Sequence, residues 1–278
     1  MKIALMGDLH YPSKNGVTKP MAQRTLQARD EFFPSFLNEF FSEQADFHIA
    51  LGDLTNFGQA DEYKEVYQLI RQYDSNFVHV IGNHDLYQMG YDAVQDFTKQ
   101  KPYDFMEKDG AVYVRLCTAR ELSPANYGGS LDEAQLEWLE KIIHQSGTKP
   151  IIVFAHHPIV DTTKFSNRDM YSIDPAINMW SILSQKKGNG FYLNGHTHVN
   201  DIMKKEQWDF CQCCAVMDFP SIRILTIEAG QISFSTKEIL LSERMKENLL
   251  ILKNGVEAFV SEPNASEITS IRELTVYF

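Results

Sequence analysis

The chain has little positive charge. Its 278 residues include 26 lysine and arginine residues against 37 aspartate and glutamate residues, which gives a formal net charge of −11 at pH 7. General nucleic-acid binders and membrane-surface binders depend on basic patches that release counterions or meet anionic lipid. We therefore expect neither nucleic acid nor membrane as a partner. A small anionic substrate is compatible with this charge, because bound metal ions can dominate the potential inside a site.

Long apolar runs and disulfide patterns are also missing from the sequence. No run is long enough to span a bilayer, and Met1 leads almost at once into a strand-like segment rather than a signal segment. These features predict a cytoplasmic protein. The four cysteines, Cys117, Cys211, Cys213 and Cys214, lack the spacing of a disulfide framework, so we expect reduced thiols. In a strand, Cys214 points away from Cys211 and Cys213, which disfavours a shared metal.

The remaining composition is that of a globular protein. A chain with 44% hydrophobic residues can bury a full core and fits one large domain, or one domain with an appendage. Apolar runs predict strands at residues 2–6, 47–51, 77–81, 111–117, 151–155, 191–194, 210–217, 222–228 and 231–236, the last two joined by a hairpin turn at Ala229-Gly230.

Helical periodicity occurs between these strands. It predicts helices at residues 21–43, which Pro34 divides, and at residues 59–73, which with the strands on either side forms a βαβ unit. Ser130-Leu131-Asp132-Glu133 has the form of a capping box that opens a helix through about residue 144. Asp174 is expected to cap a helix that ends near residue 188, and residues 242–252 form another.

Polar residues of catalytic type directly follow five of the predicted strands. The segments are Gly7-Asp8-Leu9-His10, Gly52-Asp53, Gly82-Asn83-His84-Asp85, His156-His157-Pro158 and Gly195-His196-Thr197-His198. Each one alone is weak evidence, because a Gly-Asp pair is usually a turn and a lone histidine is usually a satisfied polar residue. Together they supply oxygen and imidazole ligands, without cysteine, at the strand ends where open α/β sheets bind ligands. The joint pattern therefore indicates a site for divalent metal ions.

In this order and with these gaps, the five segments resemble the calcineurin-like metallophosphoesterase superfamily. The resemblance covers about residues 1–200 and extends to the strands near residue 236. It implies an α/β fold in which two mixed β-sheets flanked by helices form a four-layer αββα sandwich, with a dinuclear metal site at the carboxyl ends of the strands. We accordingly expect a catalytic domain over residues 1–236 and a C-terminal extension of unknown role over residues 237–278, which carry no recognised motif.

The resemblance also assigns the metal ligands. One ion is held by Asp8, His10 and His198, the other by Asn83, His156 and His196, and Asp53 bridges the two. A bridging carboxylate holds two cations about 3.5–4 Å apart, the separation that suits phosphoryl transfer. Manganese, iron and zinc all accept these ligands, so the identity of the two divalent ions stays open.

His84 resembles the family histidine that faces the substrate. It is expected to stabilise the developing charge or to protonate the leaving oxygen, and Asp85 is expected to orient it. The implied reaction is attack of a metal-bridging hydroxide on phosphorus. The isolated His79 is assigned a structural role.

The substrate is less closely defined by the sequence. Protein Ser/Thr phosphatases usually have Glu after the motif histidine and an Asp-Arg pair after the Gly-Asp segment, and this chain has neither. Its motifs are more similar to those of bacterial cyclic-nucleotide and glycerophosphodiester phosphodiesterases, so we expect hydrolysis of a small phosphodiester. The alternatives are a phosphomonoesterase acting on a small metabolite, or a non-catalytic metal-bound partner-binding protein. Tyr11, His157 at the site mouth and Arg168 are candidate substrate contacts, and the oligomeric state is open.

Overall fold

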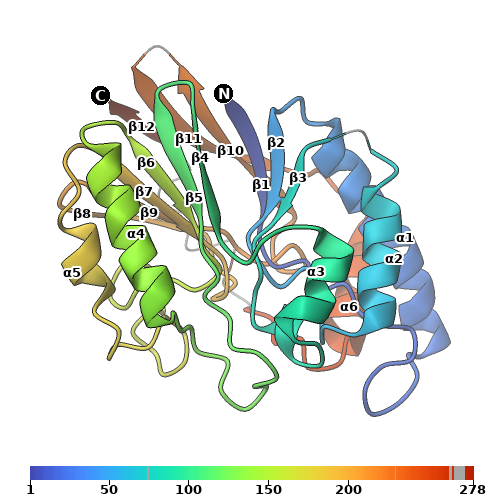
Figure 1. Cartoon of the computed structure of the whole chain (residues 1–278). Coiled ribbons are helices and arrows are strands. Elements are labelled where there is room, and N and C mark those ends of the chain that lie inside the picture. The colour runs from blue at the N-terminus through green and yellow to red at the C-terminus, as the bar shows by residue number, and fades with distance from the viewer. Residues whose placement is uncertain (74, 229, 263–264, 266–272) are drawn as a thin grey trace.

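The computed structural model describes residues 1–73, 75–228, 230–262, 265 and 273–278. Two six-stranded β-sheets pack face to face, and helices cover both outer surfaces (Figure 1). Both sheets are mixed. The predicted four-layer αββα sandwich is therefore confirmed. The described helices include none with the length and apolar character that crossing a bilayer requires.

The first sheet has the strand order β12-β11-β10-β1-β2-β3. Its strands are β1 Lys2–Met6, β2 Phe47–Ala50, β3 Phe77–His79, β10 Ser221–Glu228, β11 Gln231–Glu238 and β12 Leu274–Tyr277. β1, β2 and β3 run parallel, so their carboxyl ends meet at one edge. The predicted hairpin of β10 and β11 is present, although Ala229 of its turn lies outside the described residues.

The second sheet has the order β4-β5-β6-β7-β9-β8. Its strands are β4 Asp104–Lys108, β5 Ala111–Arg115, β6 Ile151–Phe154, β7 Gly190–Asn194, β8 Asp201–Lys205 and β9 Trp208–Gln212. The four inner strands are parallel, whereas β4 and β8 lie antiparallel at the two edges. The sequence did not predict β4 or β8, because edge strands with exposed and charged residues lack the apolar run of a buried strand.

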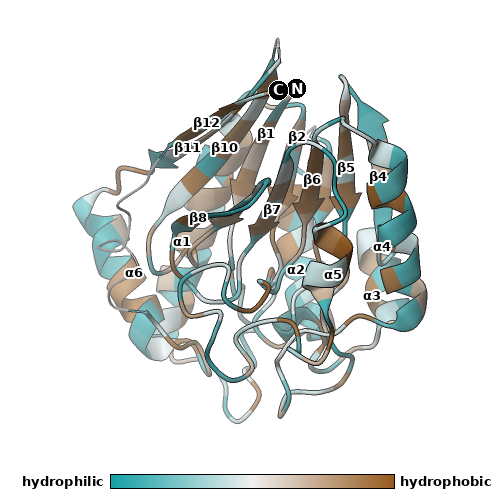
Figure 2. Cartoon of the chain, turned by 90° about the vertical axis from the view of Figure 1, so that its left-hand side faces the viewer, coloured by the Kyte–Doolittle hydropathy of each residue, from teal (hydrophilic) through white to brown (hydrophobic). Residues whose placement is uncertain are grey.

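Alternation along the strands separates the layers of the core. Ile3 and Leu5 of β1 pack between the sheets, whereas Ala4 and Met6 pack against the helices of the first sheet. Those helices are α1 Gln23–Ser42, α2 Ala60–Ile70, α3 Tyr91–Thr98 and α6 Glu243–Gly255. The second sheet is covered by α4 Glu133–Ser146 and α5 Met179–Leu183. Figure 2 shows the inner strands in hydrophobic colours and the outer sides of α4 and α6 mostly in hydrophilic ones.

The helix over residues 23–42 is continuous, so the predicted division at Pro34 is wrong. Proline removes one intrahelical hydrogen bond and crowds the preceding turn. Here the helix also buries an apolar face that includes Phe32, Phe33 and Phe36, and this packing holds both parts of the helix in line.

Two predicted helix starts are displaced in the structure. Asp132, rather than Ser130, caps α4, because its carboxylate accepts the Gln135 N–H at 2.7 Å. Asp174 forms a turn by accepting the Ala176 N–H at 3.0 Å, and α5 begins only after Asn178, which caps it. An Asp-Pro pair suits both a turn and a helix start, so the sequence alone did not distinguish them.

The C-terminal residues join the first sheet and its helical layer. β11 crosses the predicted boundary at residue 236 and ends at Glu238, and β12 pairs with it. α6, which Ser242 caps, packs along α1, where Asn248 donates to Glu31 at 2.9 Å. The division at residue 236 stays a prediction, and part of the extension lies outside the described residues.

Candidate metal centre

The seven predicted ligands gather where the two sheets meet. They follow β1, β2 and β3 of the first sheet and β6 and β7 of the second, at the carboxyl ends of these strands. Asp8, His10, Asp53, Asn83 and His156 are buried, and His196 and His198 are half-buried. Segments from five strand ends therefore contribute to one cluster.

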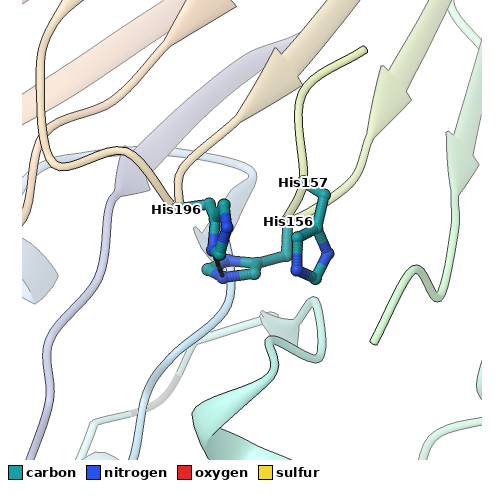
Figure 3. A group of neighbouring side chains, drawn as sticks. All are labelled: His156, His157 and His196. Carbon is teal, nitrogen blue, oxygen red and sulfur yellow. Dashed lines mark hydrogen bonds between the residues drawn. The ribbon is translucent and has the colours of Figure 1, made fainter. Parts of the chain in front are cut away.

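The first half of the centre comprises Asn83, His156 and His196. His156 Nε2 lies 3.0 Å from Asn83 Oδ1, 3.2 Å from His196 Nδ1 and 3.2 Å from Asp53 Oδ2. Figure 3 shows the rings of His156 and His196, from β6 and β7, turned toward each other. His156 Nε2 thus lies within 3.2 Å of candidate ligand atoms from three other strand ends.

Hydrogen bonds on the outer side of these residues fix which atoms face inward. His156 Nδ1 donates to the Leu51 carbonyl at 2.8 Å, and His196 Nε2 donates to the Met170 carbonyl at 2.9 Å. A carbonyl only accepts, so the neutral imidazoles present lone pairs to the centre. The Asn83 amide donates to Tyr87 Oη at 2.6 Å, which likewise turns Asn83 Oδ1 inward. Acceptors this close repel one another unless a cation lies between them, so the donor set fits a divalent ion.

The second half of the centre comprises Asp8, His10 and His198. Each offers one ligand atom within 4.8 Å of the others. His198 Nε2 lies 3.1 Å from His10 Nε2 and 3.3 Å from Asp8 Oδ2. Asp8 Oδ1 is buried without a hydrogen-bond partner among the described residues. A buried carboxylate that has one unpaired oxygen, and whose other oxygen lies beside the His198 ring, also fits a cation.

Asp53 lies between the two halves. Its Oδ2 atom is 3.2 Å from His156 Nε2 and 3.9 Å from His10 Nε2. The other carboxylate oxygen accepts the backbone N–H of His84 at 2.8 Å, which fixes the orientation of the side chain. This is the position that a bridging carboxylate requires.

Burial and neighbouring charges shift the pKa values of the carboxylates and imidazoles in the centre. Burial raises the pKa of Asp8 to about 7, although His156 and His198 act against it. Burial opposes ionisation of Asp53 as well, yet the nearby His156 and His84 hold its pKa well below the usual value. Burial disfavours a charged His156, but the Asp53 and Asp8 carboxylates raise its pKa to about 9. A proton on His156 thus supplies the charge that a metal ion would bring.

Four of the candidate ligands have unusual backbone conformations. His10, Asp53, His196 and His198 have φ values of 50°, 48°, 73° and 61°. Such values are uncommon for residues other than glycine and are concentrated at functional sites, where the surrounding structure holds them. The strained turns direct these side chains into the centre.

The glycines of the motifs allow the strand ends to approach one another. A Cβ atom on Gly195 would collide with Asp8 Oδ1, and one on Gly82 would collide with the Asp53 carboxylate. Glycine is thus needed at these positions because a ligand from a neighbouring strand occupies the space of a side chain.

His84 lies beside the centre and lines the cavity above it. Its ring packs edge-on against His10 with centroids 4.5 Å apart. Its Nδ1 atom donates to the Asn56 carbonyl at 2.6 Å, which leaves Nε2 as the inward nitrogen. Burial lowers the pKa of His84, although Asp53 acts in the opposite direction.

Asp85 does not orient His84, so that part of the prediction is wrong. The Asp85 carboxylate is buried and accepts from the Thr55 N–H at 2.9 Å and the Gly82 N–H at 2.9 Å, and it pairs with His79 Nε2 at 3.0 Å. The side chain turns back into the protein because η1 His84–Leu86 is a tight turn that separates neighbouring side chains. Asp85 instead ties the loop after β2 to the loop after β3.

His157 does not line the mouth of the site. It is fully buried behind His196, with ring centroids 4.3 Å apart, and Figure 3 shows it beside His156. Its Nδ1 accepts from the Thr118 hydroxyl at 2.8 Å, and its Nε2 donates to the Tyr127 carbonyl at 2.9 Å. Both nitrogens are occupied, so His157 supports His196 and has no lone pair for substrate or metal.

Tyr11 and Arg168 also lie away from the cavity. Tyr11 is buried under the Arg29 guanidinium, and its hydroxyl points to Glu65 at 3.4 Å. Arg168 is exposed and stacks on the Phe165 ring at 3.5 Å. Side-chain direction in a loop is set by such local partners, which the sequence pattern did not reveal.

A cavity of about 370 Å³ opens above the centre. His10, Asp53, Asn83, His84, His196 and His198 line it, and four aromatic residues form walls: Phe57, Tyr87, Tyr127 and Tyr171. The remaining lining includes Ala258, Val260, Ser261 and Glu262. These last residues belong to no motif that the sequence analysis identified. Tyr87 was also missed, although its position four residues after Asn83 places it within reach of the Asn83 amide.

The fold and the site define an αββα protein with a cluster of histidine and aspartate side chains that could hold metal ions. A family model described as Calcineurin-like phosphoesterase matches residues 1–200, and the chain belongs to that family. The resemblance found in the motifs is therefore confirmed.

Individual relatives are more distant. A probable cyclic nucleotide phosphodiesterase of Rhodopseudomonas palustris is 26% identical over 160 residues, which are 55% of this chain and 56% of the relative. A probable glycerophosphodiester phosphodiesterase of Arcobacter nitrofigilis is 28% identical over 169 residues, 58% of each chain. The match thus spans little more than half the length of these relatives. A dimetal phosphatase of Danio rerio shares the fold with a TM-score of 0.68 at 14% identity, covering 86% of this chain and 96% of that one.

Proposed function

We propose that this chain is a metal-dependent phosphoric ester hydrolase that acts on a small phosphodiester of the cyclic-nucleotide or glycerophosphodiester type. The observation that carries the proposal is the cluster of inward-facing acceptor atoms around Asp53, which fits two divalent ions. Membership of the calcineurin-like phosphoesterase family and the phosphodiesterase activities for which the two bacterial relatives are named support the substrate class.

The bound ions, whether manganese, iron or zinc, would supply an electrophilic pair and an activated water for phosphoryl transfer. Asp8, His10 and His198 would hold one ion, and Asn83, His156 and His196 the other, with Asp53 shared. Around them, His84 lies where its ring nitrogen reaches into the cavity. When protonated, His84 donates its proton to the leaving oxygen, and the Asn56 carbonyl keeps the ring oriented while it does so.

The volume and the aromatic lining of the cavity support a small substrate. Its volume of about 370 Å³ suits a small metabolite, and the tyrosine side chains above the centre offer aromatic faces to a base or sugar. Since all four cysteines are free thiols, we assign this activity to the cytoplasm.

A comparison of two chromogenic esters tests the proposal. The metal-free protein, reconstituted with manganese, is assayed with bis(p-nitrophenyl) phosphate and with p-nitrophenyl phosphate. We expect faster hydrolysis of the diester and loss of both activities with a chelator. Preference for the monoester would establish the phosphomonoesterase alternative instead. Binding of two ions without hydrolysis of either ester would identify a metal-bound partner-binding protein.

A further inference from the structure

A short segment after α6 covers one side of the metal centre. We call residues 256–262 the C-terminal strap. Phe259 of the strap is buried and stacks on the His198 ring, with centroids 5.3 Å apart and planes 17° from parallel. The same phenyl ring meets His10 edge-on at 5.2 Å. The next residue, Val260, offers its carbonyl to His198 Nδ1 at 3.1 Å. The strap therefore contacts two of the three ligands in the second half of the centre.

Asp218 completes this contact from the other side. Its Oδ2 atom lies 3.4 Å from His198 Nδ1, and its side chain is fully buried. The strap holds this carboxylate, because the Glu262 N–H donates to it at 3.0 Å and the Ser261 hydroxyl donates to its other oxygen. Lys253 Nζ, near the end of α6, lies 3.7 Å from Asp218 Oδ1. Asp218 and the strap thus form one interlocked unit behind His198.

The other histidines of the centre are held differently. The outer nitrogens of His156 and His196 meet backbone carbonyls of Leu51 and Met170, which lie within the 1–200 region that the family model matches. His198 alone depends on a carboxylate and on a carbonyl from beyond that region. The strap also reaches the substrate side, since the Asn56 amide donates to the Glu257 carbonyl at 2.8 Å and the Asn56 carbonyl orients His84.

We propose that Asp218 and the C-terminal strap are positioning elements that set the affinity of the ion held by Asp8, His10 and His198. A carboxylate behind a metal-binding imidazole fixes its tautomer and raises its basicity, and loss of such a partner costs about 10–100-fold in metal affinity. Phe259 adds a packed face that keeps the His198 ring from rotating. The inference rests on the proposed function only in requiring that the centre bind two ions.

Metal binding to the full-length, metal-free protein tests this inference without any assay of activity. Titration of manganese by calorimetry gives the affinities of the two ions in the parent protein, in Asp218→Asn and in Phe259→Ala. We expect one site to weaken by about 10–100-fold in both variants while the other site keeps its affinity. Val260→Ala is the matched control, because its side chain is 74% exposed and its carbonyl remains.

The outcomes are distinguishable from one another. Unchanged affinities in Asp218→Asn, or equal weakening of both sites, would overturn the positioning role while leaving the proposed function intact. A parent protein that binds no metal ion would overturn both. Asp218→Asn nearly preserves the shape of the side chain, so it remains informative if Phe259→Ala does not fold.

Discussion

The two halves of the metal centre are built from different parts of the chain. Around Asn83, His156 and His196, the outer atoms hydrogen-bond to groups within residues 1–200: the Leu51 and Met170 carbonyls and the Tyr87 hydroxyl. Around Asp8, His10 and His198, the support comes from Asp218 and the C-terminal strap. The first half can therefore form wherever the fold forms, whereas the second half depends on how this chain continues beyond residue 200. A substitution that acts on one half should therefore change one half alone, whereas a substitution of the bridging Asp53 should affect both halves.

Removal of the bridge should have the largest effect, because Asp53 serves both halves. In Asp53→Ala we expect fewer than two ions per chain by elemental analysis and a loss of at least about 10³-fold in diester hydrolysis, since the ions supply several kcal/mol of transition-state stabilisation. Circular dichroism provides the control for folding. Retention of two tightly bound ions would show that Asp53 is not shared.

Replacement of His84 should leave both halves loaded and slow the reaction. In His84→Ala we expect kcat for the diester to fall at least about a hundredfold, as expected for loss of an acid catalyst, with two ions still bound. His84→Gln is the matched variant, because it keeps a polar side chain of similar reach but cannot donate a titrating proton. Near-normal turnover in both variants would refute the role of His84.

Uptake of metal should depend on pH most clearly in the first half. The metal ion must displace the proton on His156, whose pKa the Asp53 and Asp8 carboxylates raise to about 9, so affinity should rise about tenfold per pH unit up to about pH 9. Calorimetry in buffers of different ionisation enthalpy would count the released protons. An affinity independent of pH between 6.5 and 9 would contradict this competition.

The folding stability of the metal-free protein should also depend on pH, through the same ionisable groups. A folded-state pKa above the unfolded value contributes stability that is present below the unfolded pKa and is lost as pH rises through the folded pKa. His156 therefore loses its contribution between about pH 6.5 and pH 9, and Asp8 loses its own between about pH 3.8 and pH 7. The difference in Tm between metal-loaded and metal-free protein should widen as pH rises to 9, which thermal denaturation checks.

The first half is also the part that sequence reasoning describes best. Apolar strands followed by polar segments indicated that the candidate ligands meet at one edge, and the family resemblance assigned Asn83, His156 and His196 to one ion. The support of His198 could not be predicted, because Asp218 and Val260 lie outside any motif and are separated from His198 in the sequence. Asp85 shows a further limit, since adjacency to His84 did not reveal that its carboxylate turns inward.

The strands and the helix that the sequence analysis did not predict lie at the surface. β4 and β8 bury few residues, so their sequences lack the apolar run of a buried strand, and α3 spans only 8 residues, of which Val94 is buried. β12 pairs only at the edge of the first sheet, with alternate residues exposed. These elements complete the sheets without positioning a ligand, which explains why the centre could be predicted more fully than its surroundings.

The smallest expected effect comes from Tyr87, and it completes the contrast between the halves. Tyr87→Phe removes the hydroxyl that accepts from Asn83 Nδ2 at 2.6 Å but keeps the ring, which packs on His84 with centroids 4.5 Å apart. A typical hydrogen bond is worth about 0.5–1.5 kcal/mol, so we expect the ion of the first half to bind about 2–10-fold more weakly. Tyr171→Phe is the control, because Tyr171 lines the same cavity without a hydrogen bond to a ligand among the described residues. If Tyr87→Phe and Asp218→Asn weakened the same site, the halves would not be separately supported; weakening of opposite sites is the result that their different contacts require.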